Sequence, residues 1–360
     1  MRVLLSCGGT GGHIYPAIAI ADKIKEKDPS SEILFIGTKT GMENKLVPEA
    51  GYEIRGVDAS GFKRKLLIRN IKTLHNAIEG GKEVEKILAE FKPDLAIGTG
   101  AYVTGIVLLH AHRAGIPCMI HEQNAVPGMT NKILSSFVDR VFISFRNTEK
   151  AFAHPDRVMF SGNPIRSDFE KLDEVKCREE LGFSKDDIIV LATGGSLGAN
   201  VLNKEVIDFA KKVDQFNVKL IFVTGKRYYD EVKEKLSAKN VMLIDYANNM
   251  PTLMKAADVV VSRAGAIAVS EILASGKPSI LVPSPNVTNN HQYHNAKAIA
   301  DEGAAILVEE SSLVEGEEVL ASEILSLISR PEDLSSMKVR AKSLAHTDAA
   351  DIIFDNLIIK

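Results

Sequence analysis

Residues 1–21, MRVLLSCGGTGGHIYPAIAIA, join a short apolar run to an alanine-rich amphipathic stretch through four glycines and His13. The apolar run predicts a strand and the amphipathic stretch predicts a helix, so the glycines lie in the turn between them. Such a turn lets backbone N–H groups approach an anion, to which the helix N-terminus adds a favourable partial charge. A tight turn that needs positive φ is the alternative for any single loop. The same order of strand, glycines and helix recurs in IIVLATGGSLGA (188–199), which favours anion binding.

Short apolar runs alternate with helical patterns in both halves of the chain. The predicted strands are RVLLS, EILFIG, DLAIGTG, PCMIHE and RVFIS in the first half, and DIIVLATG, VKLIFVTG, NVMLID, DVVVS and PSILVP in the second. These runs are apolar throughout, as expected of parallel strands that are buried on both faces. We therefore expect two similar doubly wound α/β domains in tandem with a cleft between them, joined by the turn-rich segment SGNPIRSDF (161–169).

The composition excludes several classes of protein. With 45% hydrophobic and 25% charged residues it is typical of a soluble globular protein, and a net charge of −3 provides no basic field for nucleic acid. Cys7, Cys118 and Cys177 are odd in number and widely spaced, so they indicate neither a disulfide framework nor a zinc site and fit a reducing cytosol. No uninterrupted apolar stretch approaches the roughly 20 residues that span a bilayer. We expect a soluble protein that is still able to bind a membrane surface.

The glycine loops match neither common nucleotide motif. Gly9-x-Gly11 is followed by Ile14 where a dinucleotide fingerprint needs its third glycine, and the second predicted strand runs into Thr38-Lys39 without an acid. Neither loop ends in Gly-Lys-Ser/Thr, as a Walker loop does. NAD is therefore disfavoured, and we expect a phosphate-bearing ligand of another kind.

Three further clusters carry candidate ligand-binding side chains, and the first two follow predicted strands, at the edge where open α/β sheets bind ligands. In SRAGAIAVSEILASGKP (262–278), Glu271 is either a surface acid that stabilises the helix dipole or an acceptor for a ribose diol. HEQNAVPG (121–128) places four polar side chains in a row, which argues against a packing role. In NNHQYHNAKAI (289–299), the amides of Gln292 and Asn295 share one helix face and suit sugar hydroxyls.

Six motifs, GGTGGHIYPAIAIA, HEQNAVPG, SGNPIR, GGSLGA, AGAIAVSE and QYHNA, occur together and in this order over nearly the whole chain. With them the chain resembles the MurG-type family of bacterial cell-wall N-acetylglucosaminyltransferases, which are hexosyltransferases. The resemblance implies a glycosyltransferase B-type fold, two Rossmann-like doubly wound parallel-sheet domains facing a cleft. Residues 1–163 would form the domain on the acceptor and membrane side, and residues 164–341 the domain that binds UDP-GlcNAc. A C-terminal helix of about 342–360 would pack back on the first domain.

The resemblance also implies the reaction. GlcNAc would pass, with inversion, from UDP-GlcNAc to the C4 hydroxyl of MurNAc in the undecaprenyl-diphosphate-linked acceptor lipid I. The product would be lipid II, the precursor of peptidoglycan, on which cell shape and division depend. The implied partners are therefore UDP-GlcNAc, lipid I, an anionic membrane surface and other cell-wall synthesis proteins, with no nucleic acid. The implied location is peripheral, on the cytoplasmic face of the cell membrane, the inner membrane where there are two.

Site residues carry over position by position. Glu271 would hold the ribose hydroxyls, the Ala247 backbone would meet the uracil, and Gln292 and Asn295 would contact the GlcNAc ring. Some members have two glutamines where this chain has His291-Gln292. Ser196 would lie at the diphosphate, and Arg166 would lend positive charge to the nucleotide. The other implied substrate-binding residues are Thr10, Gly11, Gly12 and Asn124, where donor and acceptor meet, and Ala266, Ile267, Ala268, Val269 and Ser270, before Glu271.

His13 is the candidate catalytic base. A histidine titrates near neutrality, so it can take the proton that the acceptor hydroxyl loses as it attacks. The alternative is that His13 begins the helix and only forms a hydrogen bond; Glu122 is the second candidate for the base. The chain has no Asp-x-Asp pair to hold a metal on the diphosphate, so we expect neither a metal nor another cofactor. Helix N-termini and a cation would stabilise the departing UDP.

The segment GFKRKLLIRNIKTLHNAI (61–78) combines basic residues with an amphipathic stripe of Leu67, Ile71, Leu74 and Ile78. One interpretation is a core helix with a solvated basic back, and the other is a contact with anionic lipid. The residues assigned to that membrane contact are Lys63, Arg64, Lys65, Leu66, Ile68, Arg69 and Lys72.

Two other functions stay open from the sequence. A UDP-GlcNAc 2-epimerase shares the two-domain architecture and the nucleotide sugar but needs no lipid acceptor. A sensor without catalytic activity would bind UDP-GlcNAc and show no turnover.

Overall fold

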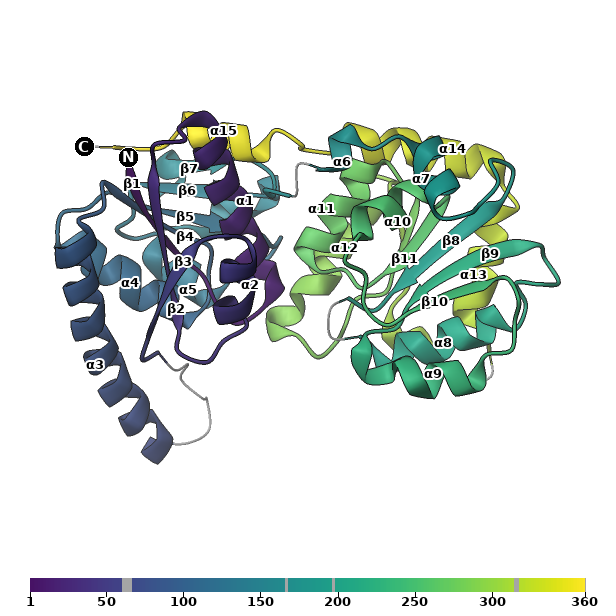
Figure 1. Ribbon diagram of the computed structural model, residues 1–360, viewed down its shortest axis with the longest axis horizontal. Coiled ribbons are helices and arrows are strands. Elements are labelled where there is room, and N and C mark those ends of the chain that lie inside the picture. The colour runs from purple at the N-terminus through teal and green to yellow at the C-terminus, as the bar shows by residue number, and fades with distance from the viewer. Residues whose placement is uncertain (60–66, 166–167, 196–197, 314–316, 360) are drawn as a thin grey trace. The chain divides into compact units, whose positions relative to one another are not determined.

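The computed structural model describes residues 1–59, 67–165, 168–195, 198–313 and 317–359, and for residues 67–77, 168 and 170 it describes the backbone alone (Figure 1). The chain divides into two compact units, Met1–Ile165 with Thr347–Lys360, and Arg166–His346. Some predicted site residues fall outside this description: Lys63, Arg64, Lys65, Leu66, Arg166 and Ser196, together with the side chains of Ile68, Arg69 and Lys72.

The first unit contains a parallel sheet of seven strands in the order β3-β2-β1-β4-β5-β6-β7. Its strands are β1 (Arg2–Ser6), β2 (Glu32–Thr38), β3 (Glu53–Val57), β4 (Leu95–Gly98), β5 (Cys118–Glu122), β6 (Arg140–Ile143) and β7 (Val158–Phe160). The chain first winds outward from β1 to β3 and then returns to β4 on the other side of β1. The carboxyl ends of β1 and β4 therefore form the switch point at which open α/β sheets bind ligands.

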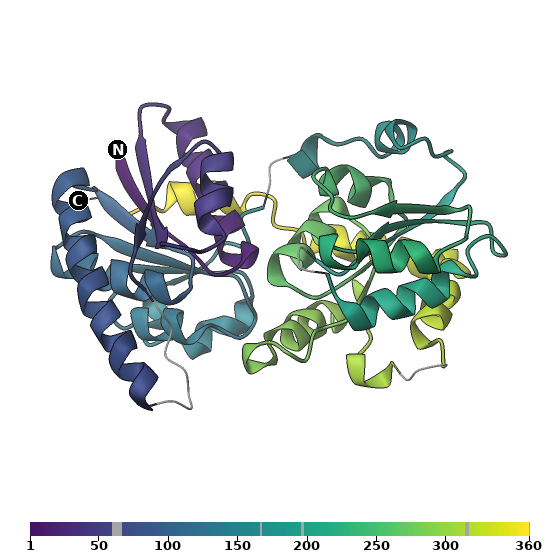
Figure 2. The ribbon, with the colours of Figure 1, turned by 60° about the horizontal axis from the view of Figure 1, so that its bottom comes forward.

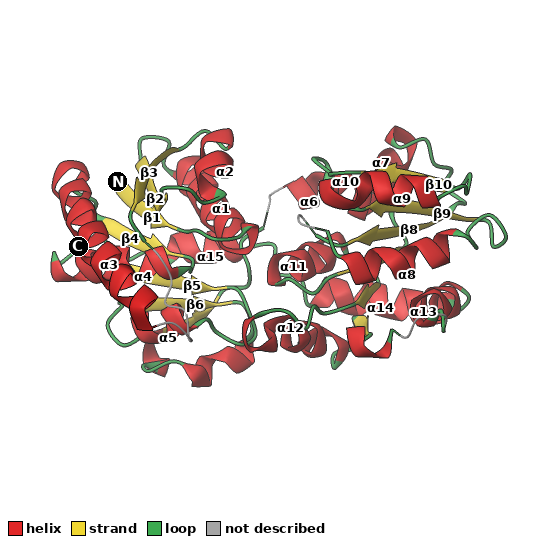
Figure 3. Cartoon of the chain, turned by 90° about the horizontal axis from the view of Figure 1, so that it is seen from below, coloured by secondary structure: helices red, strands yellow, loops and turns green. Residues whose placement is uncertain are grey.

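Helices cover both faces of this sheet (Figure 3). They are α1 (Gly11–Lys27), α2 (Glu43–Glu49), α3 (Leu67–Phe91), α4 (Tyr102–Arg113), α5 (Met129–Leu134) and α15 (Ala349–Asp355), with short 3-10 turns at Arg146–Ala151 and Pro155–Arg157. Successive side chains of β1 point to opposite faces. Val3 and Leu5 pack in the cluster that contains Ile14 of α1, whereas Leu4 packs in the cluster that contains Val107 of α4.

The last helix, α15, belongs to the first unit although it follows the whole second unit in sequence (Figure 1). Ile353 of α15 is fully buried in the same apolar cluster as Ile14 of α1. Asp351 also lies 3.0 Å from the amines of Lys23 and Lys27, both on α1. Apolar packing and ion pairs therefore both hold α15 against α1.

The second unit contains a parallel sheet of six strands in the order β10-β9-β8-β11-β12-β13 (Figure 2). Its strands are β8 (Ile188–Thr193), β9 (Val218–Val223), β10 (Val241–Ile244), β11 (Val259–Ser262), β12 (Ser279–Leu281) and β13 (Ala305–Leu307). Its helices are α6 (Asp168–Lys171), α7 (Glu174–Glu180), α8 (Asn200–Ala210), α9 (Tyr229–Lys235), α10 (Met250–Ala256), α11 (Ala266–Ser275), α12 (His291–Ala300), α13 (Val319–Ile328) and α14 (Pro331–Ser343), with 3-10 turns at Lys226–Tyr228, Thr288–Asn290 and Glu310–Ser312. Here the switch point lies between β8 and β11.

The two parallel sheets confirm the predicted fold class of doubly wound α/β domains. Within the described residues, no helix combines the length and the apolar character that a membrane span requires.

Candidate active site

The glycine loop of the first unit connects β1 to α1 at the β1/β4 switch point. Gly9 has φ +83°, a conformation that favours glycine. The loop is bound to the segment after β4, since Thr99 donates its N–H to the Ser6 carbonyl at 3.0 Å and its hydroxyl to the His13 carbonyl at 2.7 Å. The predicted residues from Thr10 to His13 therefore lie where the sheet presents its ligand-binding edge.

The ring of His13, which is half-buried, is held in one orientation by its neighbours. Its Nδ1 lies 3.1 Å from the Gly8 carbonyl oxygen. A carbonyl only accepts hydrogen bonds, so Nδ1 carries the hydrogen and Nε2 is the basic nitrogen of the neutral ring. A Cβ at Gly100 would come within 2.7 Å of the His13 ring, so only glycine fits at that position. The arrangement gives His13 the tautomer that a general base with Nε2 as its acceptor requires.

Glu43, the first residue of α2, is a buried acid next to this loop, and the sequence analysis did not single it out. It is fully buried and accepts hydrogen bonds from Gly9 N–H at 3.3 Å, Thr38 N–H at 2.8 Å and the Thr38 hydroxyl at 2.6 Å. Burial, and then the charge of Glu43, raise the pKa of the Cys7 thiol. The signal in the sequence was that Glu43 closely follows two glycines, Gly37 and Gly41. In the structure, a Cβ at either glycine would collide with the Glu43 side chain.

The polar run that begins with the last two residues of β5 corrects one expectation. His121, Glu122 and Gln123 are at most 2% exposed, so the prediction that this cluster is not packed is wrong for three of its four side chains. Burial lowers the pKa of His121 to about 4, although the hydrogen bond to the Gly162 carbonyl opposes the shift. Asn124 is the half-buried member.

The Glu122 carboxylate is surrounded by N–H donors. It accepts from the Asn124 and Gly128 backbone N–H groups, both at 3.0 Å, and from the Asn131 side chain at 2.9 Å. Glu122 therefore shapes the loop around Asn124, and this bonding argues against its role as the second candidate for the base.

The glycine loop of the second unit follows β8 and leads to α8. Gly195 has φ +79°, close to the value at Gly9 of the first loop. Its N–H donates to the Thr193 hydroxyl at 3.2 Å. Ser196, the predicted diphosphate contact, lies outside the described residues, so the structure describes this loop only on either side of it.

Loop residues after β11 lead into α11, which carries Glu271. Glu271 lies in the second turn of the helix and is half-buried. Arg263, which the sequence analysis missed, directly follows β11, donates to the Val282 carbonyl at 3.1 Å and pairs with Glu310. The signal for Arg263 in the sequence was its position directly after a strand that is predicted to be buried. All the predicted residues directly before Glu271 are buried or half-buried: Ala266, Ile267, Ala268, Val269 and Ser270.

The remaining predicted donor contacts lie in loops and a helix at the same sheet edge. The Gln292 side-chain oxygen accepts the Ser284 N–H at 2.9 Å. Asn295 is fully buried and donates to the Ala264 carbonyl at 3.1 Å, so it supports the loop that enters α11. Ala247 is half-buried in the loop after β10, beside Tyr246.

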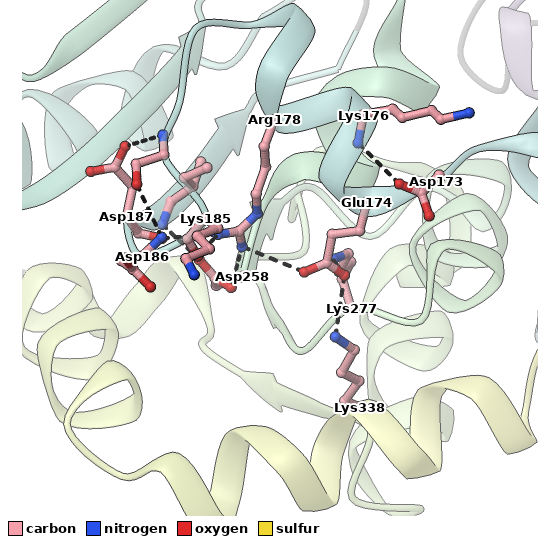
Figure 4. A network of polar contacts seen from close by, with 12 residues as sticks. Asp173, Glu174, Lys176, Arg178, Lys185, Asp186, Asp187, Asp258, Lys277 and Lys338 are labelled. Atoms are coloured by element: carbon pink, nitrogen blue, oxygen red, sulfur yellow. Dashed lines mark hydrogen bonds and ion pairs between the residues drawn. The ribbon is translucent and has the colours of Figure 1, made fainter.

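A separate pocket of about 380 Å³ lies at the opposite edge of the second sheet. Figure 4 shows the network of polar contacts to which Glu174, Arg178 and Asp258 of its lining belong. Its lining includes Ile188, the first residue of β8, and Asp258, which precedes β11. Ion pairs surround it: Arg178 lies 2.6 Å from Asp258, and Lys277 lies 2.7 Å from Glu174. Burial lowers the pKa of Lys277 to about 8, against the opposing effect of Glu174.

The described residues contain no group of three or more histidine, cysteine or acidic side chains arranged to hold a metal ion.

Comparisons with known proteins give matches along both units. The model of the glycosyltransferase family 28 N-terminal domain matches residues 3–143, and that of the family 28 C-terminal domain matches residues 189–353. The UDP-N-acetylglucosamine–N-acetylmuramyl-(pentapeptide) pyrophosphoryl-undecaprenol N-acetylglucosamine transferase of Alkaliphilus oremlandii is 44% identical, over 99% of this chain and 98% of its own length. The transferase of the same name from Acetivibrio thermocellus is 45% identical, over 99% and 97%.

Solved structures agree with these sequence matches. The crystal structure of Acinetobacter baumannii MurG has a TM-score of 0.78 at 26% identity and 98% coverage of both chains. UDP-GlcNAc 2-epimerase from Neisseria meningitidis, bound to UDP-GlcNAc, has a TM-score of 0.69 at 18% identity and 99% coverage of both chains. The likeness to the epimerase shows a shared fold alone.

Proposed function

Because this chain belongs to glycosyltransferase family 28 and, within it, to the undecaprenol-linked N-acetylglucosamine transferases, we propose that it transfers GlcNAc from UDP-GlcNAc to lipid I. The acceptor atom is the C4 hydroxyl oxygen of MurNAc, and the product is lipid II. The observation that carries this function is the identity of 44% or more to such transferases over nearly the whole chain, with both units included.

In this proposal UDP-GlcNAc binds at the carboxyl edge of the second sheet. The glycine loop after β8 and the half-buried Glu271 lie on that edge and supply, respectively, backbone N–H groups for a diphosphate and a carboxylate for a ribose diol. Gln292 and Asn295 of α12 would face the sugar, and the Ala247 backbone would meet the uracil. Arg166 and Ser196 complete the proposed donor site from outside the described residues.

The acceptor binds in this proposal at the edge of the first sheet, near Thr10, Gly11, Gly12 and Asn124. His13 Nε2 takes the proton of the C4 hydroxyl as its oxygen forms a bond to the anomeric carbon. The bond between that carbon and the diphosphate oxygen breaks, and UDP leaves with the electron pair, which inverts the anomeric centre. The orientation of His13, with Nδ1 bound to the Gly8 carbonyl, supports this role.

Contact with a membrane is a further part of the proposal, because lipid I is anchored in a bilayer. Its support is the basic amphipathic sequence of residues 61–78. The protein would bind the cytoplasmic face of the cell membrane peripherally, where other cell-wall synthesis proteins are also available as partners.

A single assay tests the transferase function against its alternatives. The purified protein is incubated with UDP-GlcNAc and a lipid I analogue, and the products are separated by chromatography. We expect the disaccharide-linked lipid together with UDP. Release of UDP or an epimerised sugar without the acceptor would indicate an epimerase, and binding without turnover would indicate a sensor.

A further inference from the structure

We propose that Glu43 is a positioning residue for His13 and acts through the peptide bond between Gly8 and Gly9. The two side chains bind opposite ends of that one peptide group. Its carbonyl accepts a hydrogen bond from His13 Nδ1 at 3.1 Å, and its N–H donates to Glu43 Oε2 at 3.3 Å. This inference deepens the proposed function, since it rests on His13 as the base of the transfer.

Through these two hydrogen bonds, the negative charge of Glu43 favours the Nδ1–H tautomer of His13. A negative charge on the N–H side polarises the peptide and makes its carbonyl oxygen a stronger acceptor. A stronger acceptor retains the hydrogen on His13 Nδ1, which leaves Nε2 unprotonated in the neutral ring. It also stabilises the imidazolium that forms once Nε2 has taken a proton. In histidine-dependent hydrolases an aspartate does the same by direct contact.

Glu43 is held firmly enough for this role. Its carboxylate is fully buried, and Oε1 accepts both the N–H and the hydroxyl of Thr38, at 2.8 and 2.6 Å. Its three donors are neutral groups, and among the described residues no ion pair cancels the negative charge beside the Gly8–Gly9 peptide. Gly8 lies close to the same carboxylate, since a Cβ at this position would approach Glu43 Oε1 to 3.0 Å, which is a tight contact.

A mechanical restraint adds to the electrostatic one. The segment that follows β4 packs against the other side of the His13 ring at Gly100. The ring is therefore confined between Gly100 and the Gly8 carbonyl, and the position of that carbonyl depends on Glu43. Loss of the carboxylate would release the peptide, and with it the ring, while the rest of α1 stays packed on the sheet.

The substitution Glu43→Gln tests this proposal, because glutamine keeps the size of the side chain but turns one end into a donor that faces other donors. We expect kcat for transfer to fall by about 10- to 100-fold, by analogy with the loss that follows when the partner that orients a metal-bound histidine is removed. The KM for UDP-GlcNAc should stay within about twofold, because the donor site lies in the second unit. In 15N NMR spectra at high pH, the parent should show the Nδ1–H tautomer of His13, and the variant should gain the Nε2–H tautomer.

Asp28→Asn is the matched control. Asp28 lies at the other end of α1 and accepts hydrogen bonds from Ser30 N–H at 3.1 Å and the Ser31 hydroxyl at 2.6 Å. Its loss removes a carboxylate with several donors from the far end of the helix that carries His13, so the melting temperature should fall while kcat and the His13 tautomer stay unchanged. A Glu43 role that was merely structural would give the same result as this control.

Two outcomes would overturn the proposal: an Nε2–H tautomer in the parent, or a folded Glu43→Gln protein with the parent's tautomer and kcat. If that variant does not fold, Thr38→Val removes one hydrogen bond to the carboxylate and should shift the tautomer in the same direction; an unchanged tautomer would again contradict us. The base role is tested separately, since an active His13→Ala protein would refute it and leave the tautomer measurement valid.

Discussion

The two glycine loops have a similar backbone conformation, but the N–H of the corresponding glycine has a different hydrogen-bond acceptor in each. Gly9 and Gly195 each follow a central strand by three residues or fewer and have φ values of +83° and +79°. The N–H of Gly9 donates to a buried carboxylate, that of Glu43, whereas the N–H of Gly195 donates to the neutral hydroxyl of Thr193. The acceptor of this glycine N–H is therefore an anionic side chain in the first unit and a neutral hydroxyl in the second.

This difference bears on which unit suits a diphosphate. An incoming phosphate at Gly9 would face the Glu43 carboxylate and repulsion between like charges. At Gly195 it would need to displace only a hydroxyl. The first loop is thus better suited to fix the position of a catalytic side chain, and the second to bind the charged donor.

The sharpest test of this division is the substitution His13→Ala in the first unit. We expect kcat to fall by roughly 10²–10⁴-fold, the usual contribution of a positioned general base. The affinity for UDP-GlcNAc should stay nearly unchanged, because the donor would bind to the other unit. Steady-state kinetics over a range of pH would measure both, and the variant should lack one limb of the parent's profile. A kcat within about fivefold of the parent's would remove His13 from the mechanism.

The substitution Glu271→Ala tests the second unit, where we expect the affinity for the donor to change and kcat to stay nearly the same. Loss of a charged acceptor from a ribose diol should weaken UDP-GlcNAc binding by about 2–3 kcal/mol, or roughly 30- to 150-fold in Kd. Titration calorimetry of both proteins would measure the change, with UDP alone as a second ligand. The kcat at saturating donor should change little. If the Kd is the same and the fold is intact, Glu271 is only a surface acid of α11.

The basic segment gives a third contrast between the units. Replacing Lys63, Arg64, Lys65, Arg69 and Lys72 by glutamine should weaken binding to anionic vesicles about tenfold or more, since each basic residue near a lipid surface contributes up to ~1 kcal/mol. Added salt should weaken the parent's binding likewise. Turnover of a short-chain soluble acceptor should not change. Vesicle sedimentation would measure the binding.

A control of equal charge comes from the second unit, where the same number of exposed lysines can be replaced: Lys204, Lys211, Lys233, Lys235 and Lys239. This protein should bind vesicles as the parent does. Equal losses in both variants would mean that net charge alone, and not the basic segment, determines vesicle binding.

The smallest effect on activity is expected at the opposite edge of the second sheet. Glu174→Ala leaves Lys277, which is 1% exposed, without its carboxylate and should lower the free energy of unfolding by about 2 kcal/mol. That is less than for a fully buried pair, because Glu174 is 32% exposed. Lys277→Met removes the buried charge itself and should be nearly neutral. Urea denaturation would measure both, and a larger loss in Lys277→Met would contradict this account.

The pH dependence of stability follows from the same lysine. Burial lowers the pKa of Lys277 to about 8 in the folded chain, against 10.5 for an unperturbed lysine. Between these values the unfolded chain binds more protons, so this residue's contribution to stability rises with pH. Lys277→Met should remove that rise, whereas an identical pH profile in parent and variant would show that Lys277 does not titrate in this range.

Much of the fold could be predicted because the central strands are buried on both faces. Strands such as β4 and β11 are buried at every residue and have no polar side chain except that of Ser262, which ends β11. The strands that the sequence analysis missed, β3, β7 and β13, lie at sheet edges and have partly exposed residues, which weakens the apolar pattern. Edge position depends on pairing between distant segments, so it could not be read from local composition.

The candidate site was predictable in position but not in its supporting contacts. The glycines and His13 identify the β1/α1 turn from the sequence alone. In the sequence, Glu43 resembles an ordinary surface acid. Its burial arises only in the folded protein, where the loop after β2 lies against the loop after β1. Similarly, the Glu122 carboxylate could be interpreted as a catalytic group until its N–H donors, among them the distant Asn131, were located.

The positions of the three cysteines provide separate reporters for the two units. Cys7 and Cys118 are fully buried in the first unit, and Cys177 is 2% exposed in the second. Burial raises the pKa of both Cys7 and Cys177, so neither of these two residues presents much thiolate to an alkylating reagent in the native protein. Modification then requires local opening, and its rate at each cysteine reports how often the surrounding structure opens. Mass spectrometry of the alkylated chain would thus measure the opening of the first and the second unit in one sample, without a substitution or an attached label.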